Sequence, residues 1–205
     1  SGQMCIRDRF VAGNYSNLEI AADAFDGFVG SVAFASGATN YDALLNALID
    51  SGTVQSIKIY TDEQQQGYTE YTIGENSDVT IQYVGCEVPE DIPQKWNGLT
   101  VTEVTMESCI EDNFIYDGNF NEHTCTITGY QGALPKELLI PVTLDGMYVT
   151  EIGDSAFANE NRESSDSLTL ESVKFDEESV CEKIGESAFH SQYKLSTVML
   201  ADSIT

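Results

Sequence analysis

Apolar side chains recur along the chain in short triplets separated by small or polar residues. Two triplets begin at Leu170 and Leu195, and two begin at Val29 and Val54, so each pair has a step of 25 residues. A short strand that returns at a fixed step cannot bury its apolar side alone and must stack on its neighbours. The pattern therefore predicts a strand-rich repeat solenoid. The four triplets are Val29/Val32/Phe34, Val54/Ile57/Ile59, Leu170/Val173/Phe175 and Leu195/Val198/Leu200.

A six-residue motif precedes three of these triplets. It reads Ile-Gly-Asp-Ser-Ala-Phe at 152–157 and Ile-Gly-Glu-Ser-Ala-Phe at 184–189, and a related Ile-x-x-x-Ala-Phe stands at 20–25. We expect each motif to form a short helical turn that leads into a strand. The two C-terminal motifs begin 32 residues apart, and the excess lies in the polar stretch 158–167, which predicts an inserted surface loop.

One longer helix is predicted at residues 41–50. Thr39 or Asn40 is a suitable N-cap, and Gly52 is placed to end the helix. Its apolar residues share one face, which we expect to cover the solenoid core. They are Leu44, Leu45, Leu48 and Ile49.

The middle of the chain has the alternating pattern of β-hairpins. Apolar and polar residues alternate on both sides of a turn at 74–78, and again around an Asp-Gly-Asn turn at 117–119. The polar stretch 61–67 has no apolar periodicity and is the best candidate for a linker or loop.

The two hairpin regions belong to a duplicated module. Matching residues of the two copies are offset by 46 to 48 positions, and the tetrapeptides VTEV and VTEI close the copies. Cys125 takes the place of Val79 in this alignment, and Cys109 that of Phe157, so both thiols are expected in the apolar core. The matches are Val79/Cys125, Ile81/Ile127, Tyr83/Tyr130, Gly85/Gly132, Pro93/Pro141, Gly98/Gly146, Val101/Val149 and Val104/Ile152.

The charge of the chain restricts its partners. The 34 acidic and nine basic residues among 205 give a net charge of −25, which repels nucleic acid and anionic membrane surfaces. No run of 18 apolar residues occurs, so no segment is expected to insert into a membrane. Acidic stretches such as 176–178 are expected to be solvated surface and lack the spacing of a calcium loop, although calcium binding stays open.

The sequence has no catalytic or metal-binding pattern. The five cysteines, at 5, 86, 109, 125 and 181, form no CxxC pair and are expected to be buried free thiols. His123 and His190 are the only histidines, and no GxSxG, HExxH, phosphate-binding or dinucleotide-binding motif occurs. We therefore expect no enzyme, no cofactor and no metal site.

The motifs at 152–157 and 184–189, with the lead-in CTITGYQGALPKELLIPVTLDGMYVTEIGDSAF, closely resemble the BspA-like leucine-rich repeat family of bacterial proteins. The resemblance is strong over 123–205, moderate over 17–60 and weaker over 68–109. It implies an α/β repeat solenoid with short parallel strands and short helical turns, to which β-hairpin insertions and the helix at 41–50 are added.

The same resemblance implies a function. Members of the family are mainly secreted or cell-surface proteins, which implies a non-catalytic module that adheres to a protein or glycan on host or neighbouring cells. The alternative is a structural spacer or accessory repeat region of a larger extracellular enzyme or surface protein.

The predicted organisation has five parts. Residues 1–9 combine a tag remnant with QMCIRDR, which resembles a translated sequencing adaptor, so we expect a foreign segment on a metagenomic gene. Divergent leucine-rich repeats follow at 10–60, the linker or loop at 61–67, module copy one at 68–109, and copy two with the later repeats at 110–205. The last repeat breaks off at residue 205, which predicts a fragment of a longer protein.

The contact surface is expected on the sheet face that points away from the core. Because side chains alternate along a strand, the residues between the apolar positions of each triplet point outward. The candidate ligand-binding residues are Ser56, Lys58, Ser172, Lys174, Thr197 and Met199. Solenoid ends leave apolar positions uncovered, so self-association through these ends is also predicted.

Overall fold

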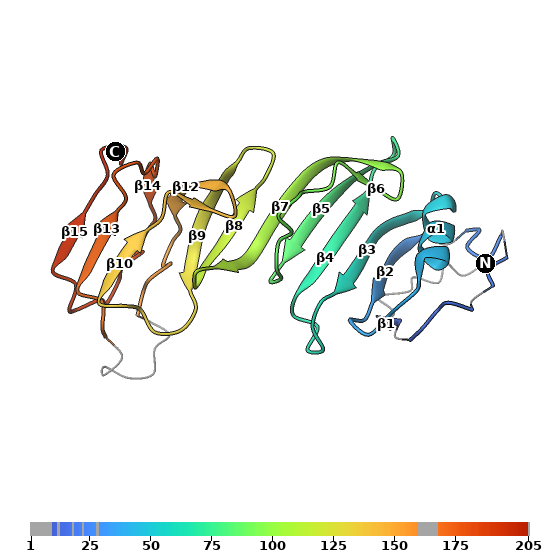
Figure 1. Cartoon of the computed structure of the whole chain (residues 1–205), viewed down its shortest axis with the longest axis horizontal. Coiled ribbons are helices and arrows are strands. Elements are labelled where there is room, and N and C mark those ends of the chain that lie inside the picture. Colours follow the sequence, from blue (N-terminus) through green and yellow to red (C-terminus); the bar gives the residue numbers. More distant parts are fainter. Residues whose placement is uncertain are drawn as a thin grey trace. The chain divides into compact units, whose positions relative to one another are not determined.

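The structure is a computed structural model that describes residues 10–11, 13–17, 19–21, 23–27, 29–159 and 168–204. The predicted foreign segment 1–9, which includes Cys5, and most of the predicted loop at 158–167 lie outside the described residues. The chain divides into two compact units, the first ending at Val104 and the second beginning at Thr105. Figure 1 labels the helix and the strands along the chain.

The first unit begins with the parallel strands β1 (Phe10–Val11), β2 (Gly30–Phe34) and β3 (Val54–Tyr60). Val32 lies opposite Ile57, and Phe34 lies opposite Ile59. Both pairs join residues 25 positions apart, which confirms the step predicted from the apolar triplets. Successive repeats therefore stack as neighbouring coils.

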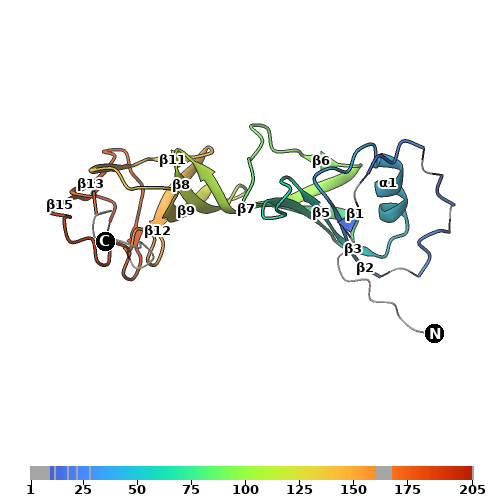
Figure 2. The same ribbon diagram turned by 90° about the horizontal axis from the view of Figure 1, so that it is seen from below.

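Helix α1 (Asp42–Asp50) packs on one face of this parallel ladder (Figure 2). Its residues Leu45 and Leu48 are buried in one cluster with Phe34 and Ile57. The predicted helix and its core-covering face are confirmed. Burial of these side chains stabilises the helix, because an isolated segment of this length is marginal in water.

The predicted N-caps of this helix are wrong. The capping position is Tyr41, which makes no side-chain capping hydrogen bond, and its ring stacks on Phe34 with centroids 4.4 Å apart. Asn40 instead donates from Nδ2 to Asn14 Oδ1 at 3.0 Å, so its side chain serves another contact. Gly52 follows the helix with a φ of 70°, a conformation that favours glycine, as its predicted role requires.

An antiparallel hairpin follows the parallel strands of the first unit. Strands β4 (Tyr68–Ile73) and β5 (Asp78–Val84) pair with each other, and β4 also pairs with β3.

The stretch 61–67 is the loop between β3 and β4. The Asp62 carboxylate accepts hydrogen bonds from the backbone N–H of Gln66 at 3.0 Å and of Gly67 at 2.6 Å, which lowers the pKa of Asp62.

The two copies of the duplicated module have the same strand register. In the first copy, strand β6 (Lys95–Trp96) pairs with β7 (Leu99–Glu111), and Trp96 lies opposite Leu99. In the second copy, β11 (Thr143–Leu144) pairs with β12 (Met147–Ile152), and Leu144 lies opposite Met147. The second pair lies 48 residues after the first. The hydroxyl groups of Thr102 and Thr150 donate to Val79 and Cys125 carbonyl oxygens, both at 3.4 Å.

The predicted turn at 117–119 is wrong. These residues belong to β8 (Phe114–Asn119), which pairs with β9 (Thr124–Tyr130), and the turn lies at 120–123. A Cβ on Gly118 would lie 2.7 Å from the sulfur of buried Met147. Gly118 is therefore needed for close packing within a strand, where sequence alone suggests a turn.

The rest of the second unit consists of stacked coils. Each coil contributes one strand to each of two parallel ladders. One ladder is β9, β12 and β14 (Lys183–Ile184), in which Ile127, Ile152 and Ile184 are in register. The other is β10 (Glu137–Ile140), β13 (Ser172–Phe175) and β15 (Thr197–Met199), side by side in Figure 1. The partners Val173 and Val198 repeat the 25-residue step.

The two glycine-containing motifs form turns that stack on one another. Ser155 N–H donates to Glu186 O at 2.9 Å, and Phe157 N–H donates to Ala188 O at 2.8 Å. A further hydrogen bond joins the two motifs, because Gly185 N–H donates to the Ile152 carbonyl at 2.7 Å. The repeats are thus joined by backbone hydrogen bonds through their turns as well as through their strands.

Three cysteines are buried free thiols, as predicted. Cys109, Cys125 and Cys181 are at most 3% exposed, while Cys86 is half-buried. Burial raises the pKa of Cys125 to about 12. None of these four cysteines forms a disulfide.

Cys125 is expected to resist alkylation in the folded protein. At pH 8 a thiol with a pKa of about 12 is ionised in only about one molecule in ten thousand, and the thiolate is the reactive form. Iodoacetamide treatment followed by peptide mass mapping should leave Cys125 unmodified in buffer and modify it fully in denaturant. Equal modification under both conditions would contradict this placement.

Candidate functional site

The structure separates the six predicted site residues between the two units. In the first unit, the expectation that Ser56 is exposed is wrong, because it is 7% exposed and its hydroxyl bonds to Ser31 Oγ at 2.8 Å. Lys58 lies 3.7 Å from a Glu70 carboxylate oxygen, and its amine is 4.8 Å from the ring centroid of Tyr68. Both side chains thus have partners within the protein.

The other four predicted residues lie on one face of the β10–β13–β15 ladder. Ser172 is opposite Thr197, and Lys174 is opposite Met199. Leu139 of β10 is the partner of Lys174 on its other side. Leu139 and Met199 are each 54% exposed, so two open apolar side chains flank Lys174. We call this surface, formed by Leu139, Ser172, Lys174, Thr197 and Met199, the outer sheet face.

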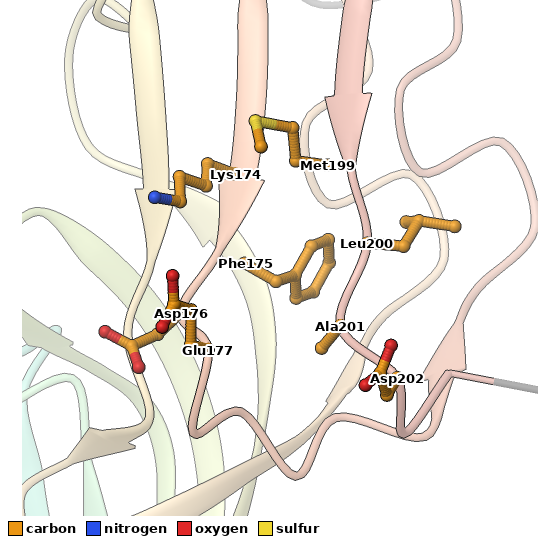
Figure 3. Close-up of a pocket in the computed structure, with 8 residues that line it drawn as sticks. All are labelled: Lys174, Phe175, Asp176, Glu177, Met199, Leu200, Ala201 and Asp202. Atoms are coloured by element: carbon orange, nitrogen blue, oxygen red, sulfur yellow. The ribbon is translucent and has the colours of Figure 1, made fainter.

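A pocket opens where β13 and β15 end (Figure 3). Its volume is about 350 Å³. The buried ring of Phe175 lies between the two chain segments, and Leu200 points away from it. We call this the strand-end pocket. It is lined by Lys174, Phe175, Asp176, Glu177, Met199, Leu200, Ala201 and Asp202.

The strand-end pocket combines apolar surface with an excess of negative charge. Phe175 and Ala201 supply apolar atoms, and the other lining residues include three acidic residues and one lysine, whose amine points away from Phe175 in Figure 3. Asp176 accepts a hydrogen bond from Glu178 N–H at 2.9 Å, which orients that carboxylate. The described part of the chain places no carboxylate within 4.0 Å of the Lys174 amine. This arrangement favours a cationic group on an apolar stem.

Sequence reasoning missed much of this surface. Leu139 was not predicted, because Glu137-Leu-Leu-Ile140 does not alternate and resembles a buried run. Asp176 and Glu177 follow β13, and Asp202 comes three residues after the end of β15. Because the strands are parallel, their ends lie at one edge of the sheet, and this could have indicated that the three carboxylates lie near the same edge.

The histidines and the acidic side chains of the described residues form no metal-binding cluster. Within the described ranges, no three His, Cys, Asp or Glu side chains are placed to hold a metal ion. His123 and His190 are exposed, and His190 Nδ1 lies 3.0 Å from Ser191 Oγ. No helix among the described residues is long and apolar enough to cross a membrane.

Stacked parallel strands, a 25-residue step and turns that pair through their backbones define a leucine-rich-repeat-type solenoid. It is strand-rich, with α1 as the single helix of the described residues. The predicted fold class is confirmed.

Comparison with solved structures finds similarity to the T. pallidum leucine-rich repeat protein TpLRR, with 24% sequence identity and a TM-score of 0.38. The match covers 46% of this chain and 40% of that chain, so the chain matches less than half of that protein's length. No protein-family model matches the chain, and no curated protein matches it significantly.

Proposed function

We propose that this chain is a non-catalytic binding module of a BspA-like, secreted or cell-surface protein, and that the outer sheet face is its contact surface. The observation that carries the proposal is the pair of exposed apolar side chains, Leu139 and Met199, held in register on both sides of Lys174. Grouped exposed apolar side chains mark interaction surfaces more often than scattered ones do.

The geometry of the ladder suits this role. Hydrogen-bonded parallel strands hold the outer sheet face in one conformation, so little ordering is needed on binding. Buried partners such as Leu138, Val173 and Phe175 anchor the opposite side of the same strands. Outward residues can therefore vary, and so change the ligand, without disturbing the core.

The proposed partner is a protein or glycan on host or neighbouring cells. The sequence resemblance described above supports this choice, and the net charge of −25 favours partners that are not polyanions. Extracellular localisation is part of the same proposal.

Cell binding tests the proposal. The fluorescently labelled chain is applied to panels of bacterial and epithelial cells and scored by flow cytometry, before and after protease or periodate treatment, which separates protein from glycan ligands. We expect Leu139→Asp to weaken saturable binding by about tenfold, because a charge replaces a contact side chain. The matched control is Ile110→Asp, which changes a residue 46% exposed on β7 of the same unit and should leave binding unchanged.

Two results would contradict the proposal. Equal effects of the two variants would show that the outer sheet face is not the contact surface. Absence of saturable binding across the panels would instead favour the spacer role.

A further inference from the structure

Three aromatic side chains gather on one side of the sheet in the first unit. Trp96, the single tryptophan of the chain, stacks on Tyr71 of β4 with ring centroids 4.0 Å apart. Tyr71 lies opposite Ile57, which is buried under α1, and α1 and β6 lie on the same side of the sheet in Figure 2. Tyr41 directly precedes α1. We call Tyr41, Tyr71 and Trp96, all of them half-buried, the aromatic cluster.

The second copy of the module buries the equivalent positions completely. Tyr116 is the counterpart of Tyr71, because each lies opposite the same isoleucine of the module. Leu144 is the counterpart of Trp96, because each is followed by the same tight turn. Tyr116 and Leu144 are at most 1% exposed, and the Tyr116 hydroxyl donates to Asp145. In the first copy the same positions stay partly open to solvent.

The aromatic cluster presents hydrogen-bond donors without acceptors. In the described part of the chain, no protein group accepts a hydrogen bond from the Tyr41 hydroxyl, the Tyr71 hydroxyl or the Trp96 indole N–H. Asn97 takes the place of Asp145, with the same φ of 45°, but it makes no hydrogen bond to Tyr71. None of the three donors is fully buried, so a ligand can reach them. A ligand with acceptor groups and an apolar surface would complete the site.

The chemistry of the aromatic cluster selects among ligands. A proline-rich peptide in the polyproline II conformation offers apolar rings, together with carbonyl acceptors that make no internal hydrogen bonds. Its proline residues have no backbone N–H, so the peptide brings acceptors without donors and matches the cluster. A sugar instead brings a hydroxyl donor with most of its acceptors, and these donors need carboxylate or amide partners that the cluster itself lacks. The observations therefore favour the peptide.

We infer that the aromatic cluster of the first unit binds a proline-rich segment of a partner protein in the polyproline II conformation. A proline ring packs on the partly exposed ring of Trp96, and neighbouring peptide carbonyls accept hydrogen bonds from the indole N–H and the Tyr71 hydroxyl. Such a peptide is already extended before it binds, so little conformational entropy is lost. This site lies in the first unit, apart from the outer sheet face, and goes beyond the proposed function.

Tryptophan fluorescence provides the first test, because Trp96 is the single tryptophan and belongs to the site. The probe is acetyl-GPPPPPPG-amide, added to the full 205-residue chain. We expect a saturable blue shift of the emission with a dissociation constant of about 0.1–1 mM, as water leaves the indole ring. The same peptide made with D-proline has the same composition but the opposite helical hand, so it should cause no shift.

Conservative variants identify the contacts, with binding measured from the anisotropy of the fluorescein-labelled peptide. Tyr71→Phe keeps the stacked ring and removes the hydroxyl, so it should weaken binding about fivefold without changing the urea midpoint. Trp96→Leu carries the residue of the second copy and should abolish measurable binding. The matched control is Tyr116→Phe, which should leave binding unchanged but lower the urea midpoint of the second unit, because this hydroxyl has a protein acceptor.

Several results would overturn the inference. These are no fluorescence change up to about 5 mM peptide, an equal shift with the D-proline peptide, or equal affinities of Tyr71→Phe and the unchanged chain. A saturable shift with maltohexaose, but not with the peptide, would assign the cluster to a sugar. A dimer in sedimentation that is lost on Trp96→Leu would assign it to a second copy. All of these outcomes leave the proposed function standing, because Leu139→Asp tests cell binding and should not change peptide binding.

Discussion

Replacing Phe157 by alanine is expected to lower the free energy of unfolding of the second unit by about 3–5 kcal/mol. Phe157 is 1% exposed and ends the first of the two stacked turns. Its ring packs edge-on against Phe114 with centroids 6.4 Å apart, and face-on against Phe189 at 5.3 Å. The alanine variant would leave a cavity between two coils. The backbone hydrogen bonds that join the coils would prevent this cavity from closing.

Phe189→Ala is the matched control for this prediction. Phe189 occupies the same motif position one repeat later, but it is only half-buried. The expected loss is therefore smaller, about 1–2 kcal/mol, because less apolar surface leaves the core. Urea unfolding followed by circular dichroism measures both values. Equal losses in the two variants would mean that stacking does not bury the first ring more than the second.

Gly185→Ala is expected to cost about 2–3 kcal/mol. A Cβ at this position would lie 2.5 Å from Asp154 Oδ1, 2.6 Å from Asp154 N and 2.7 Å from Gly153 C. Two of these atoms belong to the backbone and cannot swing aside. The turns would have to separate, which weakens the hydrogen bonds from Gly185 N–H to Ile152 O and from Glu186 N–H to Asp154 Oδ1.

Gly129→Ala separates this steric effect from the general cost of changing glycine. Its Cβ would meet its nearest atom, the end of the Ile115 side chain, at 3.4 Å. Alanine in a strand also loses less backbone entropy than glycine, so we expect a change within about 1 kcal/mol. Thermal and urea unfolding of both variants give the comparison. A Gly185→Ala variant as stable as Gly129→Ala would show that the motif glycines are not needed for close approach.

Much of the fold could be predicted because repeated units are visible as repeated residues. The triplets beginning at Val29 and Val54 predicted the pairing of β2 with β3, and those beginning at Leu170 and Leu195 predicted that of β13 with β15. Helix α1 was predictable because its apolar face recurs at helical spacing. In both strand pairs the partner residue lies 25 positions away along the chain.

The proposed contact surface could be predicted only in part. Strand alternation placed Lys174 and Met199 on an outward face, where the structure has them. The same rule failed for Ser56, which bonds to Ser31 of the neighbouring strand and is closed to solvent. Alternation determines which side of a strand a residue takes, whereas other elements decide whether that side is covered.

The sequence by itself determined the repeat step and the stacking of parallel strands, because both follow from the periodicity of the apolar residues. Only the tertiary structure decided that Gly118 lies within a strand, that Leu139 joins Lys174 and Met199, and that Asp176 and Asp202 share a pocket. Those features depend on the register between segments separated by loops of irregular length, and local patterns do not encode that register.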